Sequence, residues 1–164
     1  MKKCVFAGTF DPPTLGHKAL LEDCLAMFDE VVVAVMVNPF KKPWFSDEER
    51  REMLRLMFSD EERVRIVIFS GTAAELLKSE NTNIYVRGVR NSVDFEYENA
   101  NFYSSLKLNK DMVSVYLPCR QELLHVSSTM VKNCLLFSAP IDDYVTEEVK
   151  EYIYRCGKNW EKSR

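Results

Sequence analysis

An uninterrupted apolar run at residues 31–37, VVVAVMV, constrains the fold more than any other stretch of the sequence. A continuous β-branched run of this kind is typical of a strand that is buried on both faces, as in a parallel sheet. Shorter apolar runs at residues 4–7, 64–69, 84–86 and 113–117 are the other strand candidates. The sequence therefore predicts about five strands.

Helical patterns separate these strand candidates. Leu21, Cys24, Leu25 and Phe28 recur at the spacing of one helix face. A capping box, serine followed three residues later by glutamate, opens the next helix at residues 46–49. Further helices are predicted at residues 73–78, 93–106, 129–136 and 146–155.

This alternation predicts an α/β fold: a Rossmann-like open parallel sheet of about five strands with helices on both faces. The length of 164 residues suits one domain, and a hydrophobic content of 46% is enough for one sizeable core. We therefore expect residues 1–164 to form a single domain. Its C-terminal helix is expected at about 146–155, followed by a frayed, charged tail at about 158–164.

Charge and cysteine content exclude several classes of protein. A net charge of −3 disfavours a general nucleic-acid-binding surface. No apolar run approaches the roughly 18 residues of a membrane span, and no signal peptide is recognised before the first strand. The cysteines are five in number, irregularly spaced and without a C-x-x-C pair, which disfavours a disulfide framework or a zinc site. A reduced, cytoplasmic compartment fits this pattern.

The motif GTFDPPTLGH at residues 8–17 directly follows the first predicted strand. It predicts a strand, a tight glycine-containing turn, and a helix that carries His17 in its first turn. Backbone N–H groups, a hydroxyl and an imidazole at a helix start suit a phosphate group. We expect His17 to donate to a phosphate oxygen, and nearby phosphate charge to favour the imidazolium.

Cations and hydroxyls follow the other predicted strands as well. They are Lys41 and Lys42, residues 70–72 (SGT), residues 87–90 (RGVR), Arg120, and residues 127–129 (SST). Ligands of open parallel sheets bind beyond the carboxyl ends of the strands. The coincidence predicts a positive pocket for a polyanion.

Each of these features also has a plain structural interpretation. Arg87 and Arg90 bracket a glycine and could bind phosphate bidentately, or could form surface salt bridges with Asp94 or Glu96. The three hydroxyls at residues 127–129 exceed what one helix cap needs. Two further residues have a purely structural interpretation. His125 is structural or on the surface, and Lys132 is a solvated helix charge. The acidic cluster Asp94, Glu96 and Glu98 is a solvated face, or else a metal or ribose contact.

Taken together, four segments resemble the bacterial phosphopantetheine adenylyltransferases of the nucleotidylyltransferase superfamily. They are residues 8–17, residues 41–43 (KKP), residues 87–98 (RGVRNSVDFEYE) and residues 126–132 (VSSTMVK). The resemblance extends over roughly residues 3–133. The first segment indicates the superfamily, and the third indicates the acceptor.

The resemblance implies an enzyme of coenzyme A biosynthesis. ATP and 4′-phosphopantetheine would give dephospho-coenzyme A and pyrophosphate by in-line attack, without a covalent intermediate. Members of the family use Mg²⁺, are typically homohexamers and are often feedback-inhibited by coenzyme A. We accordingly expect a cytoplasmic homo-oligomer without nucleic-acid or membrane partners.

The resemblance also implies roles for individual residues. The acceptor would contact Thr9, Lys41, Ala73 and Arg87. ATP would contact Thr9, Phe10, His17, Gly88, Val89, Arg90, Glu98, Val126, Ser127, Ser128 and Thr129. The catalytic residues would be His17, Arg90, Lys41 and Ser128. No magnesium ligand is assigned.

Three alternatives remain open at the level of sequence. One is another adenylyl- or cytidylyltransferase, acting on nicotinate mononucleotide or glycerol phosphate. The second is a non-catalytic nucleotide sensor built on the same sheet. The third is a flavodoxin-like electron carrier, which would not need a histidine at a helix start and four cationic strand ends.

Overall fold

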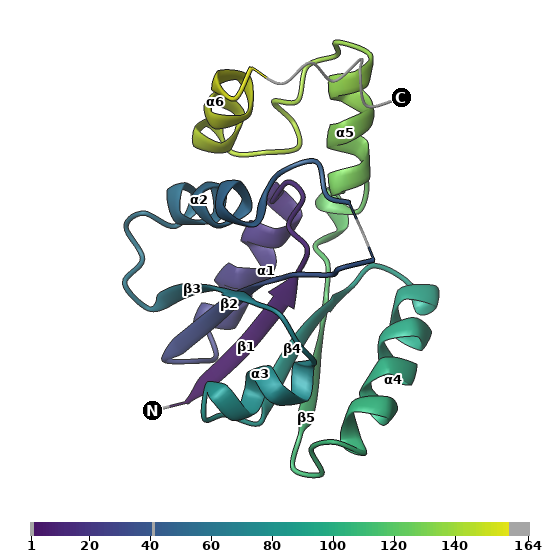
Figure 1. The fold of residues 1–164 in the computed structure, drawn as a ribbon. Coiled ribbons are helices and arrows are strands. Elements are labelled where there is room, and N and C mark those ends of the chain that lie inside the picture. The colour runs from purple at the N-terminus through teal and green to yellow at the C-terminus, as the bar shows by residue number, and fades with distance from the viewer. Residues whose placement is uncertain (1, 41, 158–164) are drawn as a thin grey trace.

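The computed structural model describes residues 2–40 and 42–157, in which strands and helices alternate along the chain (Figure 1). The elements are β1 (Lys3–Gly8), α1 (Leu15–Leu25), β2 (Glu30–Met36), α2 (Asp47–Met57), β3 (Val64–Phe69), α3 (Ala73–Ser79), β4 (Ile84–Val89), α4 (Ser92–Leu106), β5 (Val113–Pro118), a short 3-10 helix (Gln121–Leu123), α5 (Ser128–Leu136) and α6 (Glu147–Arg155). The predicted tail lies outside the described residues. That the whole chain is one domain stays a prediction.

The five strands form one sheet in the order β3-β2-β1-β4-β5, with every neighbouring pair parallel. The Rossmann-like α/β fold is thereby confirmed. Strand β1 is central, because Val5 pairs with Val32 of β2 on one side and with Tyr85 of β4 on the other. The connections change direction between β1 and β4. In open α/β sheets, this switch point is where ligands bind.

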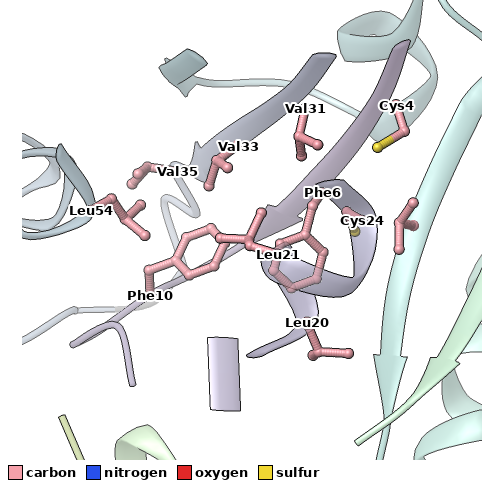
Figure 2. Packing of buried hydrophobic residues seen from close by; sticks show 11 residues of the cluster. Cys4, Phe6, Phe10, Leu20, Leu21, Cys24, Val31, Val33, Val35 and Leu54 are labelled. Carbon is pink, nitrogen blue, oxygen red and sulfur yellow. The ribbon is translucent and has the colours of Figure 1, made fainter. Parts of the chain in front are cut away.

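One face of the sheet is covered by α1 and α2. Phe6 of β1 and Val33 of β2 belong to the same buried cluster as Leu21 of α1 and Leu54 of α2. Figure 2 shows Val33 projecting from the same side of β2 as its neighbours two residues away, as the two-residue period of a strand requires. Phe10, in the loop after β1, joins this cluster and carries it to the end of the sheet.

The opposite face is covered by α3 and α4. Val5 and Val32, which alternate with the side chains of the first cluster, pack with Leu76 and Leu77 of α3. Phe102 of α4 is only partly buried against this cluster, and within the described chain no residue of α4 is buried. The continuous apolar sequence of β2 is explained, because both of its faces are covered by helices.

A third cluster lies beyond the carboxyl edge of the sheet, where Figure 1 places α5 and α6. It combines Met53 of α2, Val131 and Leu135 of α5, and Val149 and Ile153 of α6. This cluster supports the first turn of α5. That turn is one wall of the cavity described below.

Local sequence signals account for most helix boundaries. The capping box at residues 46–49 is present, with the Ser46 side chain accepting from the backbone N–H of Glu49. Thr146 caps α6 in the same way, through the N–H of Val149. Helix α1 ends at Leu25, so Phe28 lies in the following turn rather than on the helix face where the pattern placed it. It still packs against the first cluster. Among the described residues, no helix is both long and apolar enough to cross a membrane.

Candidate active site

A cavity of about 370 Å³ opens at the switch point, between the ends of β1 and β4 and the start of α5. Many of the predicted site residues line it. They are Phe10, His17, Arg87, Gly88, Arg90, Glu98, Val126, Ser127, Ser128 and Thr129. Three distant parts of the chain thus meet where the pattern of strand ends predicted a polyanion pocket.

The other predicted site residues lie elsewhere. Thr9 lines a smaller neighbouring cavity of about 130 Å³, at the ends of β1 and β2. Val89 is the last residue of β4 and does not line the main cavity. Ala73 begins α3 and packs, partly buried, against the cluster on the opposite face of the sheet. Lys41 lies outside the described residues.

His17 is held in the first turn of α1 by a hydrogen bond on one side of its ring. The backbone N–H of Thr14, the N-cap residue, donates to its Nδ1 at 3.0 Å. Because Nδ1 is an acceptor, the proton of the neutral ring is on Nε2, which is left to donate. Burial of the ring, and secondarily the charge of Arg90, lower the pKa of His17 to about 4. The expected imidazolium would need a proton where the Thr14 N–H already points.

Phe10 forms the other side of the His17 environment. Its ring packs edge-on against the His17 ring, with centroids 5.0 Å apart, and is only 1% exposed. The backbone of Phe10 adopts a positive φ of 49°, in the left-handed region. This region is unfavourable for any residue that has a Cβ atom. A Cβ atom at Gly8 would lie 3.1 Å from the same ring. The turn after β1 is therefore tightly determined by the packing of one aromatic side chain.

Arg50 of α2 also holds this turn. Its guanidinium is 1% exposed, donates from Nη1 to the carbonyl oxygen of Thr9 at 2.6 Å, and pairs with Asp47. A weaker contact of 3.5 Å reaches the carbonyl oxygen of Met36, at the end of β2. Arg50 therefore joins the ends of β1 and β2. No motif in the sequence marks Arg50 as a site residue, although it lies one turn after the capping serine.

Arg87, near the end of β4, and Arg90, directly after it, both have carboxylate partners. Arg87 pairs through Nη1 with Glu98 of α4, and its guanidinium lies 4.4 Å from the ring centroid of Tyr85. Arg90 donates from Nε to Asp94 at 2.8 Å, as the salt-bridge alternative expected. These pairs orient the two cations along the cavity wall.

The buried Nε of Arg87 has no hydrogen-bond partner among the described residues. A buried donor without a partner costs free energy. Pairing with Arg90 holds the pKa of Asp94 below its usual value, so this carboxylate stays charged. The cavity wall therefore carries two arginine–carboxylate pairs, and the buried Nε of Arg87 has no partner among the described residues.

The start of α5 supplies hydroxyl and backbone groups with different tasks. Ser127 is the N-cap and accepts from the N–H of Met130 at 3.1 Å. The Ser128 hydroxyl donates to the carbonyl oxygen of Pro12 at 2.8 Å, so its proton is already engaged. Thr129 is exposed on the cavity rim. An anion here would be bound chiefly by backbone N–H groups at the helix start.

Close packing between α1 and β4 shapes the floor of the cavity. A Cβ atom at Gly88 would lie 2.2 Å from Cδ1 of Leu20, so the absence of a side chain allows this approach. Leu20 and Leu123, together with Val126, give the cavity an apolar part of its lining. No motif in the sequence marks Leu20 or Leu123 as a site residue. The signal for Leu20 was its place on α1, one turn after His17.

The acidic side chains at the cavity do not form a metal cage. Asp94 and Glu98 line it, but each is paired with an arginine. Within residues 2–40 and 42–157, no group of three or more His, Cys, Asp or Glu side chains is placed to hold a metal ion.

All five cysteines are free thiols, and Cys24 is buried in the core as its place on the helix face predicted.

Comparisons with known proteins agree with this geometry. The sequence matches the cytidylyltransferase-like family over residues 5–134. It is 38% identical over 157 residues to a protein of Aliivibrio fischeri named phosphopantetheine adenylyltransferase, covering 96% of this chain and 98% of that one. A protein of the same name from Thermotoga neapolitana is 36% identical over 150 residues, covering 92% and 93%.

A solved structure from Vibrio parahaemolyticus, provisionally described as a nicotinate-nucleotide adenylyltransferase, has a similar fold. Its TM-score is 0.73 at 24% identity, and the match covers 96% of this chain and 94% of that one. At this level of identity the likeness concerns the fold alone.

Proposed function

The chain belongs to the phosphopantetheine adenylyltransferases of the cytidylyltransferase-like family, and we propose that it transfers AMP from ATP to 4′-phosphopantetheine. The products are dephospho-coenzyme A and pyrophosphate. One observation carries this proposal: a single cavity combines the His17 imidazole, the two arginines at the carboxyl end of β4 and the start of α5. Each of these groups is suited to phosphate, and together they suit a triphosphate and a second phosphate.

The reaction needs no nucleophilic side chain. A phosphate oxygen of the acceptor attacks the α-phosphorus of ATP and forms a new P–O bond. The bond from that phosphorus to the bridging oxygen breaks in line, and pyrophosphate leaves with the electron pair. The protein contributes positioning of two anions and stabilisation of the charge that develops.

His17 and Arg90 are proposed to stabilise the transferring and leaving phosphates. The Nε2–H group donates as a neutral imidazole, because Nδ1 is held by Thr14. A neutral donor needs no proton from solvent before each turnover. The backbone N–H groups at the start of α5 hold the far phosphates, and the apolar wall with Leu20 and Leu123 takes the adenine ring.

The acceptor phosphate is proposed to lie between Arg87, Thr9 and Lys41. Arg87 supports this place for it, because it lines the main cavity and its pair with Glu98 holds the guanidinium there. Thr9 lies in the adjoining smaller cavity, toward the segment that precedes α2. The acceptor thus enters from the β2 side and ATP from the α5 side.

Magnesium is proposed to enter with ATP. Mg²⁺ prefers substrate phosphate oxygens, water and at most one or two carboxylates to an all-protein cage. Asp94 and Glu98 are the carboxylates at the cavity that could approach it. When bound, the ion would neutralise part of the charge on the triphosphate.

Assembly, regulation and location are proposed on the family resemblance. A homohexamer is supported by α4, which exposes Val93, Tyr97 and Tyr103 and has no buried residue in the described chain. Feedback binding of coenzyme A would use the acceptor side of the cavity. A cytoplasmic location stays a prediction.

The proposed activity is tested by pyrophosphate release. The protein is supplied with ATP, magnesium and 4′-phosphopantetheine, and parallel reactions contain nicotinamide mononucleotide or glycerol phosphate instead. We expect release with 4′-phosphopantetheine alone. Release with another acceptor and not with 4′-phosphopantetheine would overturn the proposal.

A further inference from the structure

A buried carboxylate lies behind the active-site turn and does not line either cavity at the strand ends. Asp11 is 3% exposed, and both of its oxygens are engaged. The backbone N–H of Trp44 is shared between Oδ1 at 3.1 Å and Oδ2 at 3.0 Å, and the N–H of Phe45 donates to Oδ1 at 2.9 Å. Oδ2 lies 2.6 Å from Nζ of Lys132. We call Asp11, Trp44, Phe45 and Lys132 the Asp11 cluster.

The Asp11 cluster joins three segments that are far apart in the sequence. Asp11 belongs to the turn after β1, Trp44 and Phe45 precede α2, and Lys132 is in α5. The Lys132 ammonium also lies 5.7 Å from the centroid of the Trp44 ring. Ser128, one helical turn before Lys132, reinforces the join through its bond to the Pro12 carbonyl.

Lys132 is therefore not the solvated helix charge that the sequence suggested. Burying a carboxylate is costly unless it is paired and hydrogen-bonded. Here the pairing uses one cation and two backbone N–H groups, and backbone groups fix the path of a loop more firmly than a side chain does. The loop fixed in this way contains Trp44 and Phe45, which directly follow residues 41–43 in the sequence.

From this geometry we infer that Asp11 is a positioning residue for nucleotidyl transfer, with Lys132 as its counter-ion. It sets the spacing between the segment that approaches the acceptor phosphate and the helix start that approaches the ATP phosphates. The inference rests on the proposed function, which places the acceptor beside Lys41. Displacements of about 1 Å in such an arrangement are sufficient to change rates by orders of magnitude.

The inference is tested with Lys132→Met, which keeps the length of the side chain and removes its charge. Lys132→Arg, which keeps the charge, is the conservative variant. Steady-state pyrophosphate release is measured while each substrate is varied in turn. We expect the KM for 4′-phosphopantetheine to rise about tenfold in Lys132→Met, with the KM for ATP changed less than about threefold. Lys132→Arg should return the acceptor KM to within about threefold of wild type.

A double variant separates positioning from simple loss of charge. In Asp11→Asn with Lys132→Met, the amide oxygen can still accept from Trp44 and Phe45, and no charge is left unpaired. We expect its acceptor KM to lie closer to wild type than that of Lys132→Met alone. Lys150→Met is the matched control. Lys150 lies in α6, pairs with Asp142 and Glu147, and does not line the main cavity. It should leave both KM values unchanged.

Equal rises in both KM values, no rise in a folded Lys132→Met variant, or no recovery in the double variant would overturn the inference. Thermal unfolding of each variant verifies the fold. If Lys132→Met does not fold, Lys132→Gln replaces it and is judged by the same results. If wild type uses a different acceptor, the proposed function fails, and the comparison made with that acceptor still decides the role of Asp11.

Discussion

His17 should make the stability of the protein depend on pH in a defined window. Its pKa lies at about 4 in the folded chain, against an ordinary value of 6.5. Between these values the unfolded chain binds a proton that the folded chain does not. Stability is therefore fully present above about pH 6.5 and falls as the pH is lowered toward 4.

The size of the effect follows from the two pKa values. Their difference corresponds to about 3 kcal/mol of unfolding free energy when fully developed. About 2 kcal/mol of this is lost between pH 7 and pH 5. The physical origin is the burial of the ring, with a smaller contribution from the charge of Arg90.

The assay is denaturant unfolding at pH 7, 6 and 5, at one protein concentration, followed by tryptophan fluorescence. His17→Asn should lose less stability than wild type over this range, by about 2 kcal/mol. His125→Asn is the matched control. His125 is the other histidine of the chain, and it is exposed to solvent with its ring edge-on to that of Tyr144. It should keep the wild-type slope.

The slope, rather than the offset between variants, carries the information, because lost hydrogen bonds shift stability at every pH. Slopes for wild type and His17→Asn that agree within about 0.5 kcal/mol would refute the neutral, acceptor-bound imidazole. An NMR titration in which the His17 ring titrates near its ordinary pKa would refute it as well.

Three further variants probe the cavity and its support. His17→Asn should lower kcat by about 10²- to 10³-fold, with the KM for ATP changed only a few-fold, in the pyrophosphate assay. Gly88→Ala should raise the KM for ATP, because the new methyl group displaces Leu20 into the cavity; an unchanged KM would show that Leu20 does not contact the nucleotide. Arg50→Leu should destabilise the fold by about 1–3 kcal/mol in denaturant unfolding, since it leaves the Thr9 carbonyl without its donor, while Asp47 is 38% exposed and stays solvated.

Much of the fold could be predicted because its signals are local. Strand β2 is apolar along its length since helices cover both faces, and Ser46 and Thr146 act as caps through backbone groups three residues away. The end of α1 was misplaced because Phe28 contacts the same core from a turn, and burial alone does not distinguish the two. The strand order depends on long-range packing that periodicity does not contain.

The site divides along the same line. Residues that follow strands, such as His17 and Arg90, could be found because parallel strands end at one edge of the sheet. The pairing of Asp11 with Lys132 could not, because these residues lie far apart in sequence and meet only through tertiary structure. The tautomer of His17 likewise depends on the backbone direction at Thr14, which no motif specifies.

The third hydrophobic cluster has a consequence for how this protein loses activity. The start of α5 is supported by Val131 and Leu135, which belong to the cluster shared with α2 and α6 rather than to the clusters on the two faces of the sheet. Local unfolding of this cluster would displace the start of α5, which lines the cavity where the ATP phosphates are proposed to bind, and would leave the five strands paired. During mild denaturation, ATP binding is therefore expected to disappear before the sheet does. A substitution such as Ile153→Ala, in a helix that carries no recognisable motif, would then resemble an active-site lesion in kinetic data.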